Sequence, residues 1–178
     1  RATALAASMS GETGVPSFGT QIQVLSSDPG SATEEFTTIF GVGDIDGPSR
    51  SVSETETTSH STGVPIQTFI PSLIDPGELS FPCFWKPDDP TQSPVSPYGL
   101  ENLFYSRKVT QFRLVTPDEF QTTRQFAGFV STLGESYPVS GVCTKDTTIR
   151  ISGAMAYVVA AVTLTPADNL TQVAGGGA

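Results

Sequence analysis

The segment at residues 77–85 alternates apolar and other side chains, which is the period-2 pattern of a strand that buries one face. Its apolar positions are Leu79, Phe81, Cys83 and Trp85. Pro82, between two of them, has no amide hydrogen to donate, which predicts an edge strand, a bulge or an outward-facing amide. A chain that contains this segment must cover its apolar face with other strands or a helix.

Further segments favour strands, and the stretches between them are rich in turn residues. The sequence has 17 Gly and 14 Pro among 178 residues, which favours short strands and turns over long helices. The predicted fold class is all-β with an α+β margin, a β-sandwich or barrel of about eight strands with one short flanking helix. Residues 49–57 are polar on both faces except at Val52, so they are expected to form an exposed strand or the start of a loop. The other expected strands lie at residues 20–25, 36–40, 111–115, 121–130 and 144–152, and the apolar run at 153–164 is expected to be a buried strand or strand pair.

The one helix is expected at residues 99–107, with about two turns. Leu100, Leu103 and Phe104 stand at positions i, i+3 and i+4, which places them on one helical face. Glu101 near the start and Arg107 near the end carry the charges that the helix dipole favours.

The connection at residues 58–75 has an irregular pattern and more apolar side chains than a free surface loop needs. Long irregular connections inside compact domains are often functional. These apolar side chains either fold back on the core of their own chain or contact a neighbouring subunit. The residues concerned are Val64, Ile66, Phe69, Ile70, Leu73 and Ile74.

Negative charge is concentrated in the first part of the chain. The sequence has 9 Lys and Arg against 18 Asp and Glu, a formal net charge of −9. Residues 1–101 hold 13 acidic and 3 basic side chains, whereas residues 102–178 hold 5 acidic and 6 basic ones. A surface that grips nucleic acid by its phosphates needs clustered Lys and Arg, so this kind of binding is not expected. The acidic part is either solvated surface or a face that repels something negative.

Motifs for catalysis and metal binding are weak. His60 is the one histidine and lies in a Ser- and Thr-rich segment without a nucleophile elbow, so it is expected to face solvent. Cys83 and Cys143 have no close ligand pair for zinc and are expected to be small buried residues, with a single disulfide between them left open. The glycines at 41–47 fit neither a dinucleotide-binding loop nor a calcium loop and are expected to form a tight β-turn. No catalytic residue, metal or cofactor is therefore predicted.

Three parts are expected along the chain: an N-terminal arm at residues 1–16, one β domain at 17–165, and a flexible C-terminal tail at 166–178. The longest apolar run has about 12 residues, fewer than the roughly 20 that a membrane-spanning helix needs. No membrane partner is predicted.

Several motifs, taken in their order along the chain, resemble the major tail tube proteins of long-tailed (siphovirus-type) bacteriophages. That family has a segment of the form F-I-P-G-L-x-D-x-G-E-L-S-F, and residues 69–81 here are FIPSLIDPGELSF, with Ser72 at the usual glycine position. A P-D-D turn, a short helix and a strand of R-x-F-R-L-V-x-P type follow in the family, and residues 87–89, 99–107 and 108–118 match them. The resemblance covers roughly residues 17–153, and the stretch after Gly153 is unmatched.

The resemblance implies a tail-tube fold whose subunits form hexameric rings that stack into a tube around a DNA channel. It implies a phage tail protein of the virion that assembles in the host cytoplasm. The implied partners are other copies of the chain, a tape measure protein in the lumen, tail terminator and distal tail proteins, and genomic DNA as a non-specific passenger. The apolar side chains of the connection at 58–75 are then expected to contact a neighbouring subunit. Glu54 and Glu56 are candidates for a negatively charged lumen, because their strand has no apolar face of its own.

Two alternative functions stay open at this stage. One is another virion β-domain, such as a capsid decoration protein or an injection-tube subunit. The other is a carbohydrate-binding or hydrolytic β-sandwich that uses Trp85, Tyr98, Tyr105, Asp88 and Asp89. The two aspartates are otherwise expected to cap the following segment or to face solvent.

Overall fold

The computed structural model of the protein describes residues 17–28, 33–57, 67–118 and 120–158. Within these residues the chain has eight strands and one short α-helix, as the sequence predicts. The predicted arm at residues 1–16 and the predicted tail at 166–178 lie outside the described residues. The elements are β1 (Gln21–Leu25), β2 (Phe36–Thr38), β3 (Ser51–Glu56), β4 (Phe69–Asp75), β5 (Glu78–Phe84), α1 (Leu100–Ser106), β6 (Thr110–Val115), β7 (Thr123–Ser136) and β8 (Thr144–Val158).

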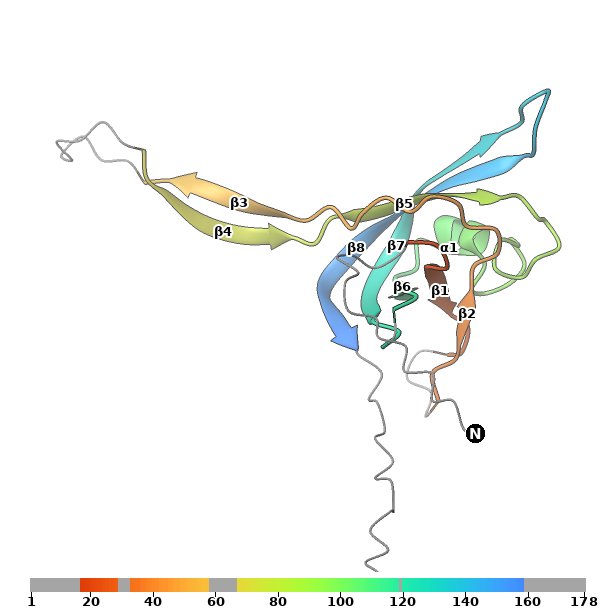
Figure 1. Ribbon diagram of the computed structural model, residues 1–178, viewed down its shortest axis with the longest axis horizontal. Helices are drawn as coiled ribbons and strands as arrows, with labels where there is room; N and C mark the ends of the chain where they lie inside the picture. The colour runs from red at the N-terminus through yellow and green to blue at the C-terminus, as the bar shows by residue number, and fades with distance from the viewer. Residues whose placement is uncertain (1–16, 29–32, 58–66, 119, 159–178) are drawn as a thin grey trace, which may run out of the picture.

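Six strands form one antiparallel sheet in the order β2-β1-β6-β7-β8-β5. Although β1 and β5 lie near opposite ends of this sheet, their apolar side chains belong to one buried cluster, together with residues of α1. The sheet is therefore curled around its core. The other two strands, β3 and β4, form a separate hairpin that projects far from this body (Figure 1).

The predicted apolar face of β5 is buried. Leu79, Phe81 and Cys83 are each at most 2% exposed, whereas Trp85 lies beyond the end of the strand and is 37% exposed. The alternation in the sequence thus identifies both the strand and the side that packs on the core.

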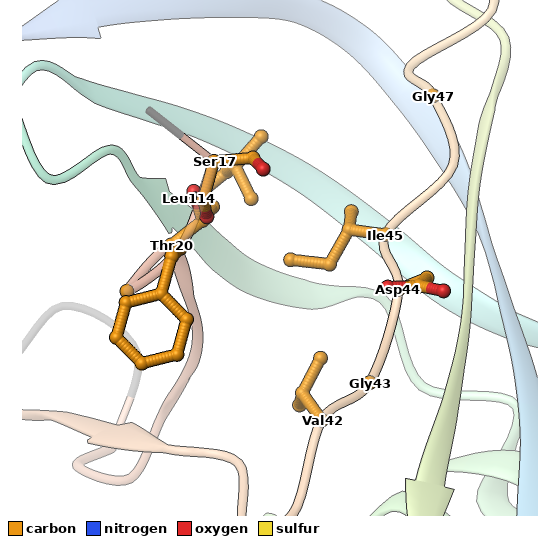
Figure 2. Close-up of a pocket in the computed structure, with 10 residues that line it drawn as sticks. Ser17, Thr20, Val42, Gly43, Asp44, Ile45, Gly47 and Leu114 are labelled. Carbon is orange, nitrogen blue, oxygen red and sulfur yellow. Dashed lines mark hydrogen bonds between the residues drawn. The ribbon is translucent and has the colours of Figure 1, made fainter. Parts of the chain in front are cut away.

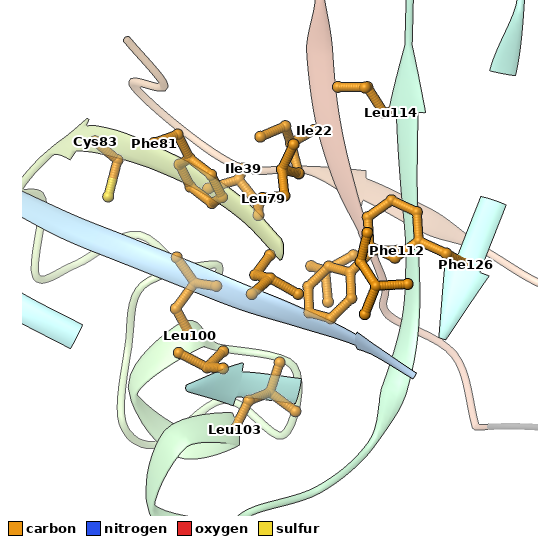
Figure 3. Packing of buried hydrophobic residues seen from close by; sticks show 14 residues of the cluster. Ile22, Ile39, Leu79, Phe81, Cys83, Leu100, Leu103, Phe112, Leu114 and Phe126 are labelled. Atoms are coloured by element: carbon orange, nitrogen blue, oxygen red, sulfur yellow. The ribbon is translucent and has the colours of Figure 1, made fainter. Parts of the chain in front are cut away.

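Two aromatic residues join the centre of the sheet. Phe112 of β6 and Phe126 of β7 are direct cross-strand partners, and their rings stack with centroids 6.0 Å apart. Leu100 and Leu103 of α1 are each 1% exposed and pack into the same cluster (Figure 3). The predicted helix is confirmed, with its apolar face on the core.

A buried cation ties α1 to the sheet. Lys145 of β8 is 2% exposed, and its Nζ lies 2.9 Å from a carboxylate oxygen of Glu101 on α1 and 3.2 Å from one of Glu135 on β7. Burial alone would lower the pKa of Lys145, but its hydrogen bonds to the two carboxylates outweigh burial and raise it. The amine therefore stays charged and holds the helix against the end of the β7–β8 hairpin.

Strand β5 is an edge strand, which is one of the positions that Pro82 predicts. Its outer edge is covered, because residues 41–49 run alongside it. The amide of Gly43 donates to the carbonyl of Pro82, and the amide of Asp46 donates to that of Ser80, each at 2.8 Å. The predicted turn is present only at Phe40 and Gly41, where Gly41 has a φ of +69°; from Val42 to Asp46 the backbone bonds to β5 instead of turning. Covering an edge in this way prevents unwanted strand pairing.

The predicted irregular connection is wrong over residues 69–75, which form β4. This strand pairs with β3 through a register shift between Val52 and Glu54. Both faces of the hairpin are exposed along nearly its whole length. Neither face packs on a core, so the sequence does not need the alternation of apolar and polar residues by which strands are recognised. Pro71 fits because each strand of a two-stranded sheet has a free edge.

Strand β8 also differs from its predicted form. It continues through Gly153 to Val158, and the described part of the apolar run expected to be buried is mostly exposed. The reason lies in the pairing of β5, which begins at Glu78 opposite Arg150. Beyond Ile151, whose amide still bonds to Gly77, β8 has only one neighbouring strand among the described residues, β7.

Candidate functional site

The β3–β4 hairpin is the candidate site, because it projects from the body and yet carries apolar side chains (Figure 1). Strand β3 is exposed at every residue, and β4 at every residue except Asp75. Four apolar side chains of β4 are more than half exposed: Phe69 51%, Ile70 56%, Leu73 77% and Ile74 70%. Exposed apolar side chains gathered in one place are typical of interaction sites in general.

The structure brings the two groups of sequence-predicted site residues onto facing strands. Glu54 pairs with Pro71 and Glu56 pairs with Phe69 across the hairpin, so two carboxylates and an aromatic ring share one face near its end. Both glutamates are exposed, and the ion pairs formed within the described residues include neither of them. The remaining two predicted residues, Val64 and Ile66, lie outside the described part of the chain.

An ion pair anchors the hairpin to the sheet at the end of β4. Nη2 of Arg150 on β8 donates to both carboxylate oxygens of Asp75, at 2.8 and 2.7 Å. The amide of Gly77 donates to Asp75 Oδ1 at 2.9 Å. The Gly77 hydrogen bond first, and then those from Arg150, hold the pKa of Asp75 below its usual value.

The chain turns from β4 into β5 at a position that only glycine fits. Gly77 has a φ of +82°, and a Cβ there would overlap the carbonyl oxygen of Ser49, just before β3. The two strands of the hairpin therefore converge tightly at this glycine, where a side chain would push them apart.

A second anchor holds the start of β3. Nη2 of Arg50 donates to the hydroxyl of Tyr157 at 2.8 Å and to the sulfur of Met155 at 3.0 Å. The hydrogen bond from Arg50 is the main reason that the pKa of Tyr157 lies below its usual value. Arg124 lies on the same ring: its guanidinium carbon and that of Arg50 are each 5.7 Å from the ring centroid.

Sequence reasoning missed the cluster of Arg50, Arg124 and Tyr157, because its members are far apart in the chain. Strand pairing places Arg124 directly opposite Tyr157 on β7 and β8. A register for the long β7–β8 hairpin could have revealed that pair, whereas nothing in the sequence connects Arg50 to it.

A cavity of about 650 Å³ lies between residues 17–20 and 42–47 (Figure 2). Ile45, Val42 and Leu114 line it together with the glycine-rich segment, and Asp44 is the one ionisable side chain among its described lining residues. A lone carboxylate without a partner acid, base or nucleophile is not a catalytic arrangement.

The remaining candidates for chemistry do not converge on a reactive centre. Cys83 is buried and Cys143 is half-buried, and both are free thiols. Burial raises the pKa of the Cys83 thiol, which makes it a poor nucleophile. In the described ranges there is no group of three or more His, Cys, Asp or Glu side chains that could hold a metal ion. His60 lies outside those ranges.

Three residues of the carbohydrate alternative, Asp89, Trp85 and Tyr98, have other partners. Asp89 accepts hydrogen bonds from the amide and the hydroxyl of Thr91, at 2.9 and 2.6 Å, in a local turn, whereas the N-cap of α1 is Gly99 and has no side-chain hydrogen bond. Trp85 packs edge-to-face on Tyr137 with ring centroids 5.8 Å apart. Tyr98 packs against the core. In the described part of the chain, no helix is long and apolar enough to cross a membrane.

Comparisons with solved structures identify the fold. A chain from the tail of an empty gene transfer agent particle, determined with C6 symmetry, is similar with a TM-score of 0.59 and 15% identity, over 78% of this chain and 95% of that one. The SPP1 tail tube is similar with a TM-score of 0.58 and 13% identity, over 81% of this chain and 80% of that one. A chain from the sheath–tube complex of an extracellular contractile injection system, PVC, has a TM-score of 0.59 and 11% identity, over 83% and 93%.

No family model matches the sequence, and no curated protein is similar to it in sequence. The chain has the tail-tube fold, which confirms the predicted fold class. Because both a phage tail tube and a contractile injection system share this fold, the fold itself does not distinguish a siphovirus tail from other tubes.

Proposed function

We propose that this chain is the repeating structural subunit of a phage tail tube, in which hexameric rings stack into a hollow cylinder. The observation that carries the proposal is an exposed apolar hairpin on a body with the tail-tube fold. Each large apolar side chain that becomes fully buried stabilises an assembly by about 1.5–3 kcal/mol. The C6 symmetry of the similar gene transfer agent tail supports a ring of six.

The hairpin is proposed to contact a neighbouring subunit through Phe69, Ile70, Leu73 and Ile74, with Val64 and Ile66 in the segment that joins its strands. The sequence left open whether these side chains pack on their own body. The high exposure of the four described ones supports the contact with another subunit.

The tube is proposed to conduct DNA as a non-specific passenger past a negatively charged lumen, since phosphates slide past a surface that repels them. Glu54 and Glu56 are candidates for that wall. Their place on the hairpin also allows a contact between subunits, and an assembly assay distinguishes the two roles. The other proposed partners are the tape measure protein in the lumen and the tail terminator and distal tail proteins at the ends. The proposed location is the tail of the virion, after assembly in the host cytoplasm.

Electron microscopy of the purified protein in negative stain tests the proposal. The expected result is rings or long hollow tubes. The matched variant replaces residues 53–73 by Asn-Gly, which joins the directly paired Val52 and Ile74 through a two-residue turn. This variant keeps the ion pair of Asp75 and should fold but stay monomeric. A monomeric wild-type protein at high concentration would count against the tube, and tubes of the shortened variant would count against the hairpin.

A tube subunit of an injection system is the second candidate, favoured by the likeness to the PVC sheath–tube complex. The two functions differ in whether a contractile sheath surrounds the tube. Co-expression with the proteins encoded beside this chain, followed by electron microscopy of the particles, distinguishes a bare tube from a sheathed one.

A further inference from the structure

We infer that the base of the hairpin is a receptor for the hairpin end of a second copy, so that Glu54 and Glu56 of one subunit bind beside Arg50 and Arg124 of the next. The inference rests on the proposed function, because it names the surface that each hairpin meets in the tube. It assigns a role to a cluster of cations whose carboxylate partners are missing from the described part of the chain.

The first observation is that these two arginines lack an acidic partner among the residues that the structure describes. Arg113, Lys145 and Arg150 each form an ion pair with a carboxylate. Arg50 and Arg124 form none within the described residues, although both lie on one tyrosine ring. Nε of Arg124 is buried and has no hydrogen-bond acceptor among the described residues. Two guanidinium groups around one ring, without a carboxylate partner there, create a positive potential that an added anion neutralises.

The second observation is that the cluster is open to a ligand. Arg50 is exposed, Arg124 is half-buried, and Tyr157, whose ring both arginines approach, is 56% exposed. Each guanidinium has five N–H donors. Arg50 uses only its Nη2 atom, for Tyr157 and Met155, and the side chain of Arg124 has no hydrogen bond within the described residues. Both can therefore donate to a carboxylate that arrives from outside.

The third observation is an apolar groove of about 440 Å³ beside Arg50, lined by Ile74, Pro76 and Met155 among others. It lies where β8 bulges. The pairs on either side of Phe126 join Gln125 to Ala156 and Ala127 to Ser152, so three residues of β8 stand opposite one of β7. A bulge of this kind bends the strand away from its partner.

The end of the hairpin complements this surface in charge and in shape. It presents the carboxylates of Glu54 and Glu56 with the ring of Phe69 on the same face. The base presents two guanidinium groups next to an apolar groove. Docking would thus pair two anions with two cations and would bury an exposed aromatic side chain.

The partner must be another copy, because a hairpin cannot fold back onto its own base. Glu56 lies six residues from Arg50 along one extended strand, a separation of roughly 20 Å at about 3.3 Å per residue. Each subunit therefore offers one end and one base, and the contact runs head to tail. Such contacts close into rings or continue as filaments, and both are elements of a tube.

Charge reversal in two separate variants tests the inference. In the end variant, Glu54→Arg and Glu56→Arg place cations against the arginines of the neighbouring base. In the base variant, Arg50→Glu and Arg124→Glu place anions against the glutamates of the neighbouring end. Each variant alone should raise the critical concentration for assembly at least tenfold above that of the wild type. A 1:1 mixture should return it to within threefold of the wild-type value, because alternating subunits then pair opposite charges at every contact.

Matched controls separate this contact from general charge attraction. The control for the end variant carries Asp44→Arg and Asp88→Arg, which make the net charge more positive by the same amount. The control for the base variant carries Arg107→Glu and Lys108→Glu, which make it more negative by the same amount. In a mixture of the end variant with the Arg107 and Lys108 variant, only the latter should sediment with the tubes, because its unchanged base repels the arginines of the end variant. In the mixture with the base variant, both proteins should sediment in equal amounts. If Arg124→Glu lowers the thermal midpoint, Arg50→Glu alone, at an exposed position, replaces the base variant with the same expected direction.

The outcomes are distinct for the receptor and for the tube. Absence of assembly in the wild-type protein overturns the proposed function. Wild-type tubes with no recovery in the mixture overturn the receptor and leave the tube intact. Wild-type-like assembly of the end variant alone also overturns the receptor, and it leaves Glu54 and Glu56 free to line the lumen.

Discussion

Replacing Leu73 and Ile74 with serine removes apolar surface that the isolated subunit leaves in water. The two side chains are 77% and 70% exposed. Fully burying such a side chain is worth about 1.5–3 kcal/mol, so at these exposures assembly still gains about 1–2 kcal/mol from each. The double change should therefore weaken each contact by about 3 kcal/mol, or roughly 100-fold in the association constant. Unfolding of the monomer should change by no more than about 0.5 kcal/mol, as for other exposed positions.

Two measurements on the same samples check these values. Sedimentation of tubes over a concentration series gives the critical concentration, which should rise roughly 100-fold. Thermal unfolding below that concentration should shift by at most about 2 °C. The control variant carries Val95→Ser and Val139→Ser, which change side chains that are 87% and 108% exposed and lie outside the hairpin. The control should leave both measurements near the wild-type values.

Either of two results would refute the reasoning. Tubes that form at the wild-type concentration would mean that assembly does not bury this surface. A fall of several degrees in the melting temperature of the monomer would mean that Leu73 and Ile74 pack on their own body, which is the other possibility that the sequence leaves open.

Three further predictions concern the anchors of the fold. Gly77→Ala should lower the free energy of unfolding, measured by urea denaturation. The left-handed backbone at this position alone should cost about 1–2 kcal/mol, and the overlap of the new Cβ with the carbonyl of Ser49 should add to that cost. Lys145→Met should cost about 2 kcal/mol by the same assay, because it leaves Glu101 and Glu135 without their shared cation; an unchanged midpoint would show that the ion cluster is dispensable. The fold lowers the pKa of Asp75, so the stability that this group contributes is present above about pH 4 and is lost as pH falls through its folded pKa. Melting curves from pH 6 down to pH 2 should show this loss, and Asp75→Asn should have a smaller pH dependence.

The parts of the fold that could be predicted are those where a core imposes a pattern. Leu79, Phe81 and Cys83 alternate in the sequence because each must enter the core, and β5 was recognised for that reason. The helix followed from Leu100 and Leu103 in the same way. Sequence periodicity reports burial on one face, and both elements have one buried face.

The hairpin was harder to predict because neither of its faces is buried by its own chain. Its apolar residues are unusual for a free loop, but the sequence did not indicate a strand there, because Pro71 interrupts the strand pattern and the pairing shifts register between Val52 and Glu54. In the cluster around Tyr157, a register for β7 and β8 could have revealed the pair with Arg124, but the contact with Arg50 could not be predicted. The residues of this cluster meet only through the pairing of β7 with β8 and the path of the chain into β3.

The sheet order has a consequence for the sequence of events in folding. In the body, Gln21 pairs with Val115 and Glu78 pairs with Arg150, so most of the chain must be present before either pairing can form. In the β3–β4 hairpin, even the most widely separated pair, Ser51 and Asp75, is only 24 positions apart in the sequence. Contacts between residues that are close in sequence form faster than contacts between distant ones. We therefore expect the β3–β4 hairpin, with its exposed apolar side chains, to form before the six-stranded sheet is complete. During that interval, exposed hairpins of different chains can bind each other before either chain has folded. The extent of this misassembly depends on the rate of folding relative to the rate at which two chains meet, and not on the stability of the folded subunit.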